Sequence, residues 1–147
     1  MRGMDDTRSG PAQAIIVAAG RGERMLGGER MLGGDKLYAM LVGRPLLAWT
    51  FAAFQRCADI DAVVVVARHD GIDRIRRLAA DWRLTKASAF VEGGATRQDS
   101  VRAGLDATEG AAVVVVHDGA RPLVTPELIS RGIALARETG AAICAVP

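Results

Sequence analysis

Aromatic residues are scarce in this chain of 147 residues, and neither sign of charge dominates. Phe, Trp and Tyr together make up 4% of the sequence, and the formal net charge at pH 7 is +2. A nucleic-acid surface, which needs many phosphate-neutralising side chains and stacking aromatics, is therefore not expected. This composition fits a small anionic ligand better.

Cysteines and long hydrophobic runs are also few. Cys57 and Cys144 lie far apart in apolar segments, so we expect two buried, reduced thiols rather than a metal or redox site. The longest apolar runs have the length of strands, and residues 1–11 lack the apolar core of a signal peptide. We predict a cytoplasmic protein without membrane association.

Short runs of Val, Ile and Ala predict strands at residues 12–18, 62–67, 87–91, 111–116 and 141–146. Helical patterns fill the gaps at residues 45–56, 72–82, 96–107 and 125–139. This alternation predicts an α/β fold, a doubly wound, mostly parallel sheet with helices on both faces. We expect residues 1–11 to be a disordered lead-in and residues 12–147 to be one domain, incomplete at its C-terminus.

The first predicted strand leads into a glycine-rich loop, AAGRGERM, at residues 18–25. Small residues let backbone amides approach a phosphate, and Arg24 can neutralise it; a flexible turn is the simpler alternative. The spacing is not that of a Walker loop, and Met25 replaces the third glycine of the dinucleotide fingerprint. The hexapeptide ERMLGG occurs twice in tandem, so Arg30 competes with Arg24 for this role.

Lys36 follows this loop and precedes an apolar segment. Taken alone it is most simply a solvated surface charge. Nucleotidyl transfer, however, builds negative charge on the α-phosphate oxygens, and two fixed cations stabilise that charge. The combination of Lys36 with Arg24 therefore favours a phosphate site.

The segment EGGATRQDS, at residues 92–100, places a glycine pair before a helix whose first turn carries Arg97 and Ser100. Backbone groups there are suited to a base edge, and the two side chains to phosphate or sugar. Thr96 and Asp99 also resemble a capping box, which is the structural alternative. A ligand-binding role and a capping role for this segment are compatible with each other.

The segment HDGARP, at residues 117–122, follows a strand that we expect to be buried on both sides. Asp118 at that edge is suited to bind magnesium beside phosphates, or else to cap the next turn. Arg121 is expected to pair with Asp118 or to bind substrate. We interpret His117 as a structural histidine with satisfied hydrogen bonds and assign it no catalytic role.

These four segments, in this order, resemble the 2-C-methyl-D-erythritol 4-phosphate cytidylyltransferases over residues 12–147. The resemblance implies a Rossmann-like nucleotidyltransferase fold. It also implies transfer of CMP from CTP to a sugar-alcohol phosphate with magnesium and release of pyrophosphate, in non-mevalonate isoprenoid synthesis. A homodimer is implied for the full-length form.

The resemblance also assigns roles to residues. Arg24 and Lys36 would stabilise the α-phosphate. The triphosphate would be held by Ala18, Ala19, Gly20 and Gly22. The base and its ribose would face Gly93, Gly94, Arg97 and Ser100. The metal and ribose region would include Asp118, with Ala120 and Arg121 beside it. Asp35 and Leu37 stand where similar enzymes have proline and glutamine, so the presentation of Lys36 differs.

Similar enzymes continue past residue 147 with acceptor-binding residues, a further lysine and a dimer arm, so we expect the chain as given not to complete the reaction. A ribitol-5-phosphate cytidylyltransferase and a fragment that binds nucleotide without catalysis are alternatives. Sugar-1-phosphate and molybdopterin nucleotidyltransferases are disfavoured because their loop usually begins with a Leu/Ala-Gly-Gly pattern, whereas this loop begins Ala-Ala-Gly.

Overall fold

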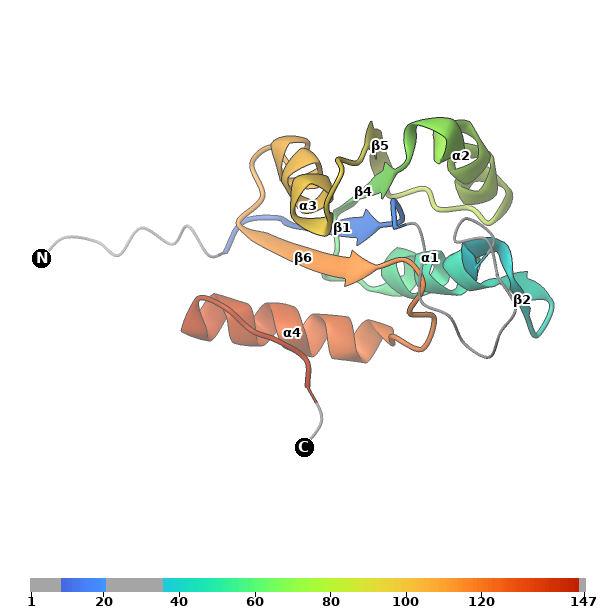
Figure 1. Cartoon of the computed structure of the whole chain (residues 1–147). Coiled ribbons are helices and arrows are strands. Elements are labelled where there is room, and N and C mark those ends of the chain that lie inside the picture. The colour runs from blue at the N-terminus through green and yellow to red at the C-terminus, as the bar shows by residue number, and fades with distance from the viewer. Residues whose placement is uncertain (1–8, 21–35, 146–147) are drawn as a thin grey trace, which may run out of the picture.

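A computed structural model describes residues 9–20 and 36–145 (Figure 1). Its main sheet is parallel and has the strand order β5-β4-β1-β6. The strands are β1 (Ala12–Val17), β4 (Ala62–Ala67), β5 (Ala87–Glu92) and β6 (Val113–Asp118). Each lies within two residues of a predicted strand, because runs of Val, Ile and Ala suit a sheet that is covered by helices.

Strand β1 is the centre of this sheet. The chain moves outward from β1 to β4 and β5 and then returns to the other side of β1 as β6. The strand order therefore reverses between β1 and β6. Ligands of open α/β sheets collect at such a switch point, beyond the carboxyl ends of the strands.

Helices cover both faces of the sheet. The larger core cluster joins Ala14 and Ile16 of β1 to α1 (Leu46–Arg56), α2 (Ile72–Asp81) and α4 (Pro126–Thr139). On the opposite face Ile15 meets α3 (Arg97–Asp106), and Figure 1 shows α3 and α4 on opposite sides of β6. The predicted doubly wound fold is confirmed.

The helix ends follow the chemistry predicted from the sequence. Thr96 caps α3 by accepting a hydrogen bond from the Asp99 amide, and the Asp99 side chain accepts one from the Thr96 amide. At the start of α4 the Thr125 hydroxyl accepts from the Leu128 amide, and Gly140 ends that helix at φ 92°. The positive φ explains why glycine stands there.

Smaller elements connect these layers. A short 3-10 helix η1 (Lys36–Tyr38) leads into a hairpin of β2 (Met40–Leu41) and β3 (Arg44–Pro45), and a second 3-10 helix η2 (His69–Gly71) precedes α2. No helix in residues 9–20 or 36–145 is long and apolar enough to cross a membrane.

The C-terminal segment differs from its prediction. Residues 141–145 are exposed and form no strand, although their composition suits one. In the described residues β6 pairs with β1 alone, and Val116 is 39% exposed, so this strand is not buried on both sides as predicted. Cys144 is exposed, contrary to the prediction, whereas Cys57 is buried as expected.

Candidate functional site

Three loops at the carboxyl edge of the sheet are held by backbone hydrogen bonds just beyond the strands. The Ala18 amide donates to the Val66 carbonyl at 2.7 Å, and the Gly93 amide donates to the Ala67 carbonyl at 2.8 Å. The Gly119 amide donates to the Val17 carbonyl, also at 2.8 Å. The loops after β1, β5 and β6 are therefore fixed where they leave the sheet.

The described part of the first loop runs from the core to the surface. Ala18 is buried, Ala19 half-buried and Gly20 exposed. Gly22, Arg24 and Arg30 lie outside the described residues. Lys36 is exposed at the start of η1, where the next residue, Leu37, packs into the core. The pairing of Arg24 with Lys36 therefore remains a prediction.

The second loop is packed tightly against the first. A Cβ placed on Gly93 would lie 2.6 Å from the Ala19 Cβ and 2.7 Å from the Ser100 Oγ. Ser100 is 3% exposed, and its hydroxyl donates to the Thr96 carbonyl at 3.1 Å. A Cβ on Gly94 would overlap with the Cβ of Asp99. The glycine pair thus lets backbone and capping residues approach closely, and the base contacts assigned to Gly93, Gly94 and Ser100 remain a prediction.

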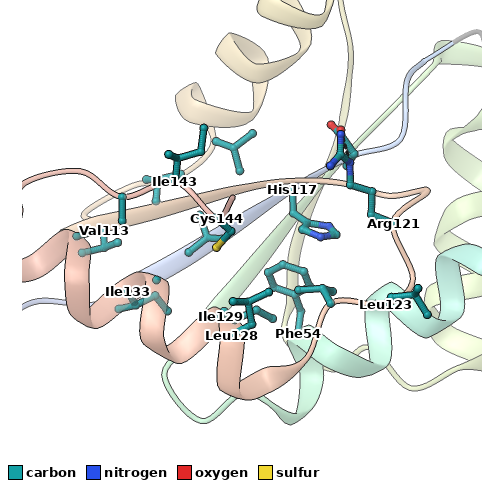
Figure 2. Close-up of a pocket in the computed structure, with 18 of the residues that line it drawn as sticks. Phe54, Val113, His117, Arg121, Leu123, Leu128, Ile129, Ile133, Ile143 and Cys144 are labelled. Carbon is teal, nitrogen blue, oxygen red and sulfur yellow. Dashed lines mark hydrogen bonds and ion pairs between the residues drawn. The ribbon is translucent and has the colours of Figure 1, made fainter. Parts of the chain in front are cut away.

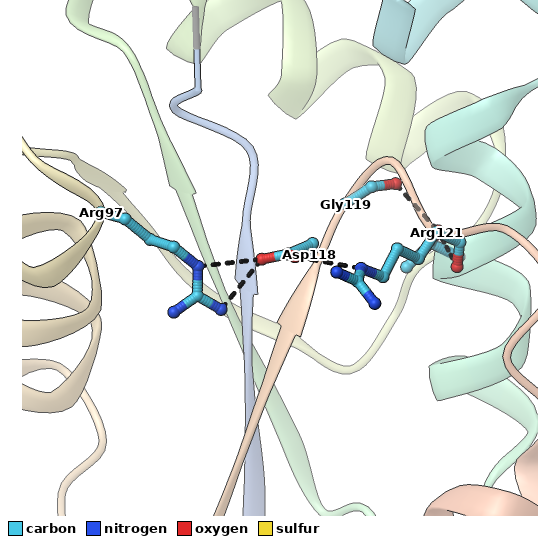
Figure 3. A network of polar contacts seen from close by, with 5 residues as sticks. Arg97, Asp118, Gly119 and Arg121 are labelled. Carbon is cyan, nitrogen blue, oxygen red and sulfur yellow. Dashed lines mark hydrogen bonds and ion pairs between the residues drawn. The ribbon is translucent and has the colours of Figure 1, made fainter. Parts of the chain in front are cut away.

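Asp118 lies at the centre of a charged cluster between these loops (Figure 3). Its Oδ1 accepts hydrogen bonds from Arg97 Nε at 3.2 Å and Nη2 at 3.0 Å, and its Oδ2 accepts from Arg121 Nε at 3.1 Å. The predicted pairing of Arg121 with Asp118 is confirmed. The contact between Arg97 and Asp118 was not predicted, because the sequence analysis assigned Arg97 to phosphate or sugar.

Thr50 is a supporting residue that the sequence analysis did not identify. Its side chain is fully buried on α1, and its hydroxyl donates to the Gly119 carbonyl at 2.9 Å. Ala120 packs against the core beside this turn. The sequence feature that could have identified Thr50 is that it is the one polar residue on the otherwise apolar buried face of α1.

His117 differs from its interpretation as a satisfied structural histidine. Its Nδ1 is buried without a hydrogen-bond partner, and its ring meets that of Phe54 edge-on, with the centroids 5.2 Å apart (Figure 2). Burial lowers the pKa of His117 below its usual value, although the nearby Asp118 carboxylate acts in the opposite direction. The neutral imidazole is therefore favoured in the folded protein.

A groove of about 680 Å³ runs along β6 and α4 from this charged cluster. Arg97, Asp118 and Arg121 border it. The rest of its lining is largely apolar (Figure 2). Ile143 and Cys144 of the C-terminal segment also line it. The groove therefore presents a polar part beside the switch point and an apolar part along the free side of β6.

A metal ion would find few protein ligands here. No group of three or more His, Cys, Asp or Glu side chains suited to a metal occurs in the described residues. Mg²⁺ is commonly held by one or two carboxylates together with substrate phosphates and water. Asp118 fits that role if the phosphates of a nucleotide supply the other oxygen ligands of the metal. One of the two arginines must then release the Asp118 carboxylate oxygen to which it is bonded.

Comparisons with known proteins identify the family of this chain. The model of the family IspD, 2-C-methyl-D-erythritol 4-phosphate cytidylyltransferase, matches residues 12–147. Proteins of that name from Cereibacter sphaeroides and Dehalococcoides mccartyi are 46% and 40% identical over 136 and 134 residues, covering 91% of this chain in both cases. The chain spans about half the length of these relatives, 57% and 56%.

Solved structures show the same fold. The 4-diphosphocytidyl-2C-methyl-D-erythritol synthase of Anaerococcus prevotii superposes with a TM-score of 0.71 at 29% identity, over 90% of this chain and 53% of that one. A CMP:2-keto-3-deoxy-manno-octonic acid synthetase complexed with CTP superposes with a TM-score of 0.63 over 89% of this chain and 49% of that one, but at 17% identity it supports the fold alone. On the family match, this chain belongs to the 2-C-methyl-D-erythritol 4-phosphate cytidylyltransferase family.

Proposed function

We propose that this chain forms the nucleotide-binding part of an enzyme that transfers CMP from CTP to 2-C-methyl-D-erythritol 4-phosphate. In this reaction a phosphate oxygen of the acceptor attacks the α-phosphorus of CTP. The bond from that phosphorus to the oxygen bridging the α- and β-phosphates breaks, and pyrophosphate leaves. The proposal rests on the family match, together with a single geometric observation, a carboxylate held between two arginines at the switch point of the sheet.

Each loop has a distinct part in this proposal. The loop of Ala18, Ala19, Gly20 and Gly22 binds the triphosphate, and Arg24 with Lys36 stabilises the charge that grows on the α-phosphate. The base and its ribose face Gly93, Gly94, Arg97 and Ser100 in this proposal. The close approach of Gly93 to Ala19 supports this arrangement, because it brings the base loop and the phosphate loop together.

Magnesium is the cofactor that we propose for Asp118. When bound, it would neutralise charge on the phosphates and help to orient them. Asp118, Ala120 and Arg121 contribute the metal and ribose region, and Thr50 holds this turn through the Gly119 carbonyl. We also propose a cytoplasmic location, and a homodimer for the full-length protein, as the resemblance implies.

Calorimetric titration of the chain with CTP and Mg²⁺ tests nucleotide binding. We expect measurable heat and a loss of affinity of about tenfold or more for Arg24→Ala and Lys36→Ala, since each removes a charge-assisted contact to phosphate. Arg131→Ala, which removes an exposed charge on α4, is the matched control and should bind like the parent. Absence of heat at millimolar CTP would contradict the proposal, as would equal effects of Lys36→Ala and Arg131→Ala.

The acceptor is tested separately with the full-length protein. Pyrophosphate release is measured with CTP and either 2-C-methyl-D-erythritol 4-phosphate or ribitol 5-phosphate. We expect turnover with the first acceptor. Preferential turnover with the second would replace the proposed acceptor while leaving CTP binding intact.

A further inference from the structure

Both carboxylate oxygens of Asp118 accept hydrogen bonds from guanidinium groups. Arg97 donates two hydrogen bonds to Oδ1, and Arg121 donates one to Oδ2. Figure 3 shows that the two arginines approach the carboxylate from opposite sides, Arg97 from α3 and Arg121 from the turn that follows β6. A cation that binds either oxygen must displace an arginine.

The cluster also carries a net charge of +1, from two guanidiniums and one carboxylate. A free divalent cation that approaches this cluster meets two positive charges, and the one negative charge that it could bind is already paired with them. A complex of the cation with a nucleoside triphosphate is anionic, so the same arginines attract it. The cluster therefore discriminates against the bare metal ion and favours the metal bound to nucleotide.

Of the two arginines, Arg97 is the better candidate for release. Arg121 lies three residues from Asp118 in the same turn, whereas Arg97 reaches it from 21 positions away on another element. Exposure does not separate the two arginines, because the side chain of Arg121 is 75% exposed and that of Arg97 is 64% exposed; the position of Arg121 in the same turn decides the choice. The pair of Arg97 with Asp118 is open to solvent, since the Asp118 side chain is also 32% exposed. Water and salt weaken such a pair, so a ligand can displace it at small cost.

We propose that Arg97 is a positioning residue that competes with a divalent cation for Oδ1 of Asp118 and gives way when a nucleotide brings the metal. This inference rests on the proposed function for the identity of the ligand. The competition between Arg97 and the cation for Oδ1 does not itself require nucleotide.

Binding of Mn²⁺ to the chain without nucleotide tests the competition, with the free ion measured by electron paramagnetic resonance. We expect Arg97→Gln to tighten Mn²⁺ binding by about 2- to 5-fold, the range over which exposed ion pairs shift equilibria. Arg102→Gln removes an equal charge from an exposed position of the same helix and should leave the affinity within about 1.5-fold. Adding Asp118→Asn to Arg97→Gln should abolish the gain.

Two results would overturn the inference. One is Mn²⁺ affinity of Arg97→Gln that equals that of Arg102→Gln, and the other is a gain that persists in the double variant. Circular dichroism and thermal unfolding of each variant confirm that the comparison is between folded proteins. Because this measurement contains no CTP, failure of the competition is distinguishable from failure of the proposed function, which the calorimetric titration with CTP reports.

Discussion

Replacing Gly93 by alanine tests how closely the base loop and the phosphate loop are packed. The added Cβ would lie 2.6 Å from the Ala19 Cβ and 2.7 Å from the Ser100 Oγ, both closer than van der Waals contact permits. The Ala19 Cβ has no rotamer with which to move away, and Ser100 is buried beneath the loop. One of the two loops must therefore shift.

Two opposing contributions determine how much Gly93→Ala changes the free energy of unfolding. Overpacking of a well-packed site typically costs about 1–3 kcal/mol. Replacement of glycine by alanine also restricts the unfolded chain, which stabilises the folded state by about 0.4–1 kcal/mol. We expect a net loss of about 1–2 kcal/mol for Gly93→Ala, or a melting temperature lower by about 3–6 °C.

Gly20→Ala is the matched control. A Cβ at this position meets nothing within 4 Å, and φ at both glycines lies outside the left-handed region. We expect the control to equal or slightly exceed the parent in urea unfolding followed by circular dichroism. Equal stability of Gly93→Ala and Gly20→Ala would refute the packing argument.

Three further predictions concern residues around the site. Thr50→Val leaves the Gly119 carbonyl without its buried donor, and urea unfolding should show a loss of about 1–2 kcal/mol; an unchanged midpoint would contradict this. Thr96→Ala removes the helix cap and should cost about 1 kcal/mol in the same assay, whereas a neutral effect would mean that the cap is dispensable. Because the pKa of His117 is lowered on folding, stability should fall as pH drops below about 6.5, with a slope from this residue of at most about 1.4 kcal/mol per pH unit. His117→Phe should flatten this dependence.

The fold was largely predictable because its signals are local. Thr125, Pro126 and Gly140 mark the two ends of α4 through their own backbone and hydroxyl chemistry, and the structure places them there. The strand predicted at residues 141–146 was wrong for residues 141–145 for a physical reason: composition indicates that a segment suits a sheet, but a strand exists only beside a partner. The sequence could not show which edge lacks a partner.

The site was predictable in its loops but not in its contacts. The segments after β1, β5 and β6 were identified because parallel strands end at one edge of the sheet. The ion pair between Arg97 and Asp118 joins residues 21 positions apart on different elements, and no periodicity indicates such a contact. The hydrogen bond from Thr50 to Gly119 joins residues 69 positions apart and could not be predicted from the sequence for the same reason.

The position of Asp118 depends on the sheet rather than on its two arginines. It is the last residue of β6, paired in register with Val17 of β1, and the next amide, that of Gly119, donates to the Val17 carbonyl. Loss of Arg97 should therefore change the charge around the carboxylate while leaving the backbone that carries it in place. For this reason a change in metal affinity on replacing Arg97 can be assigned to competition at Oδ1 rather than to a displacement of the Asp118 carboxylate.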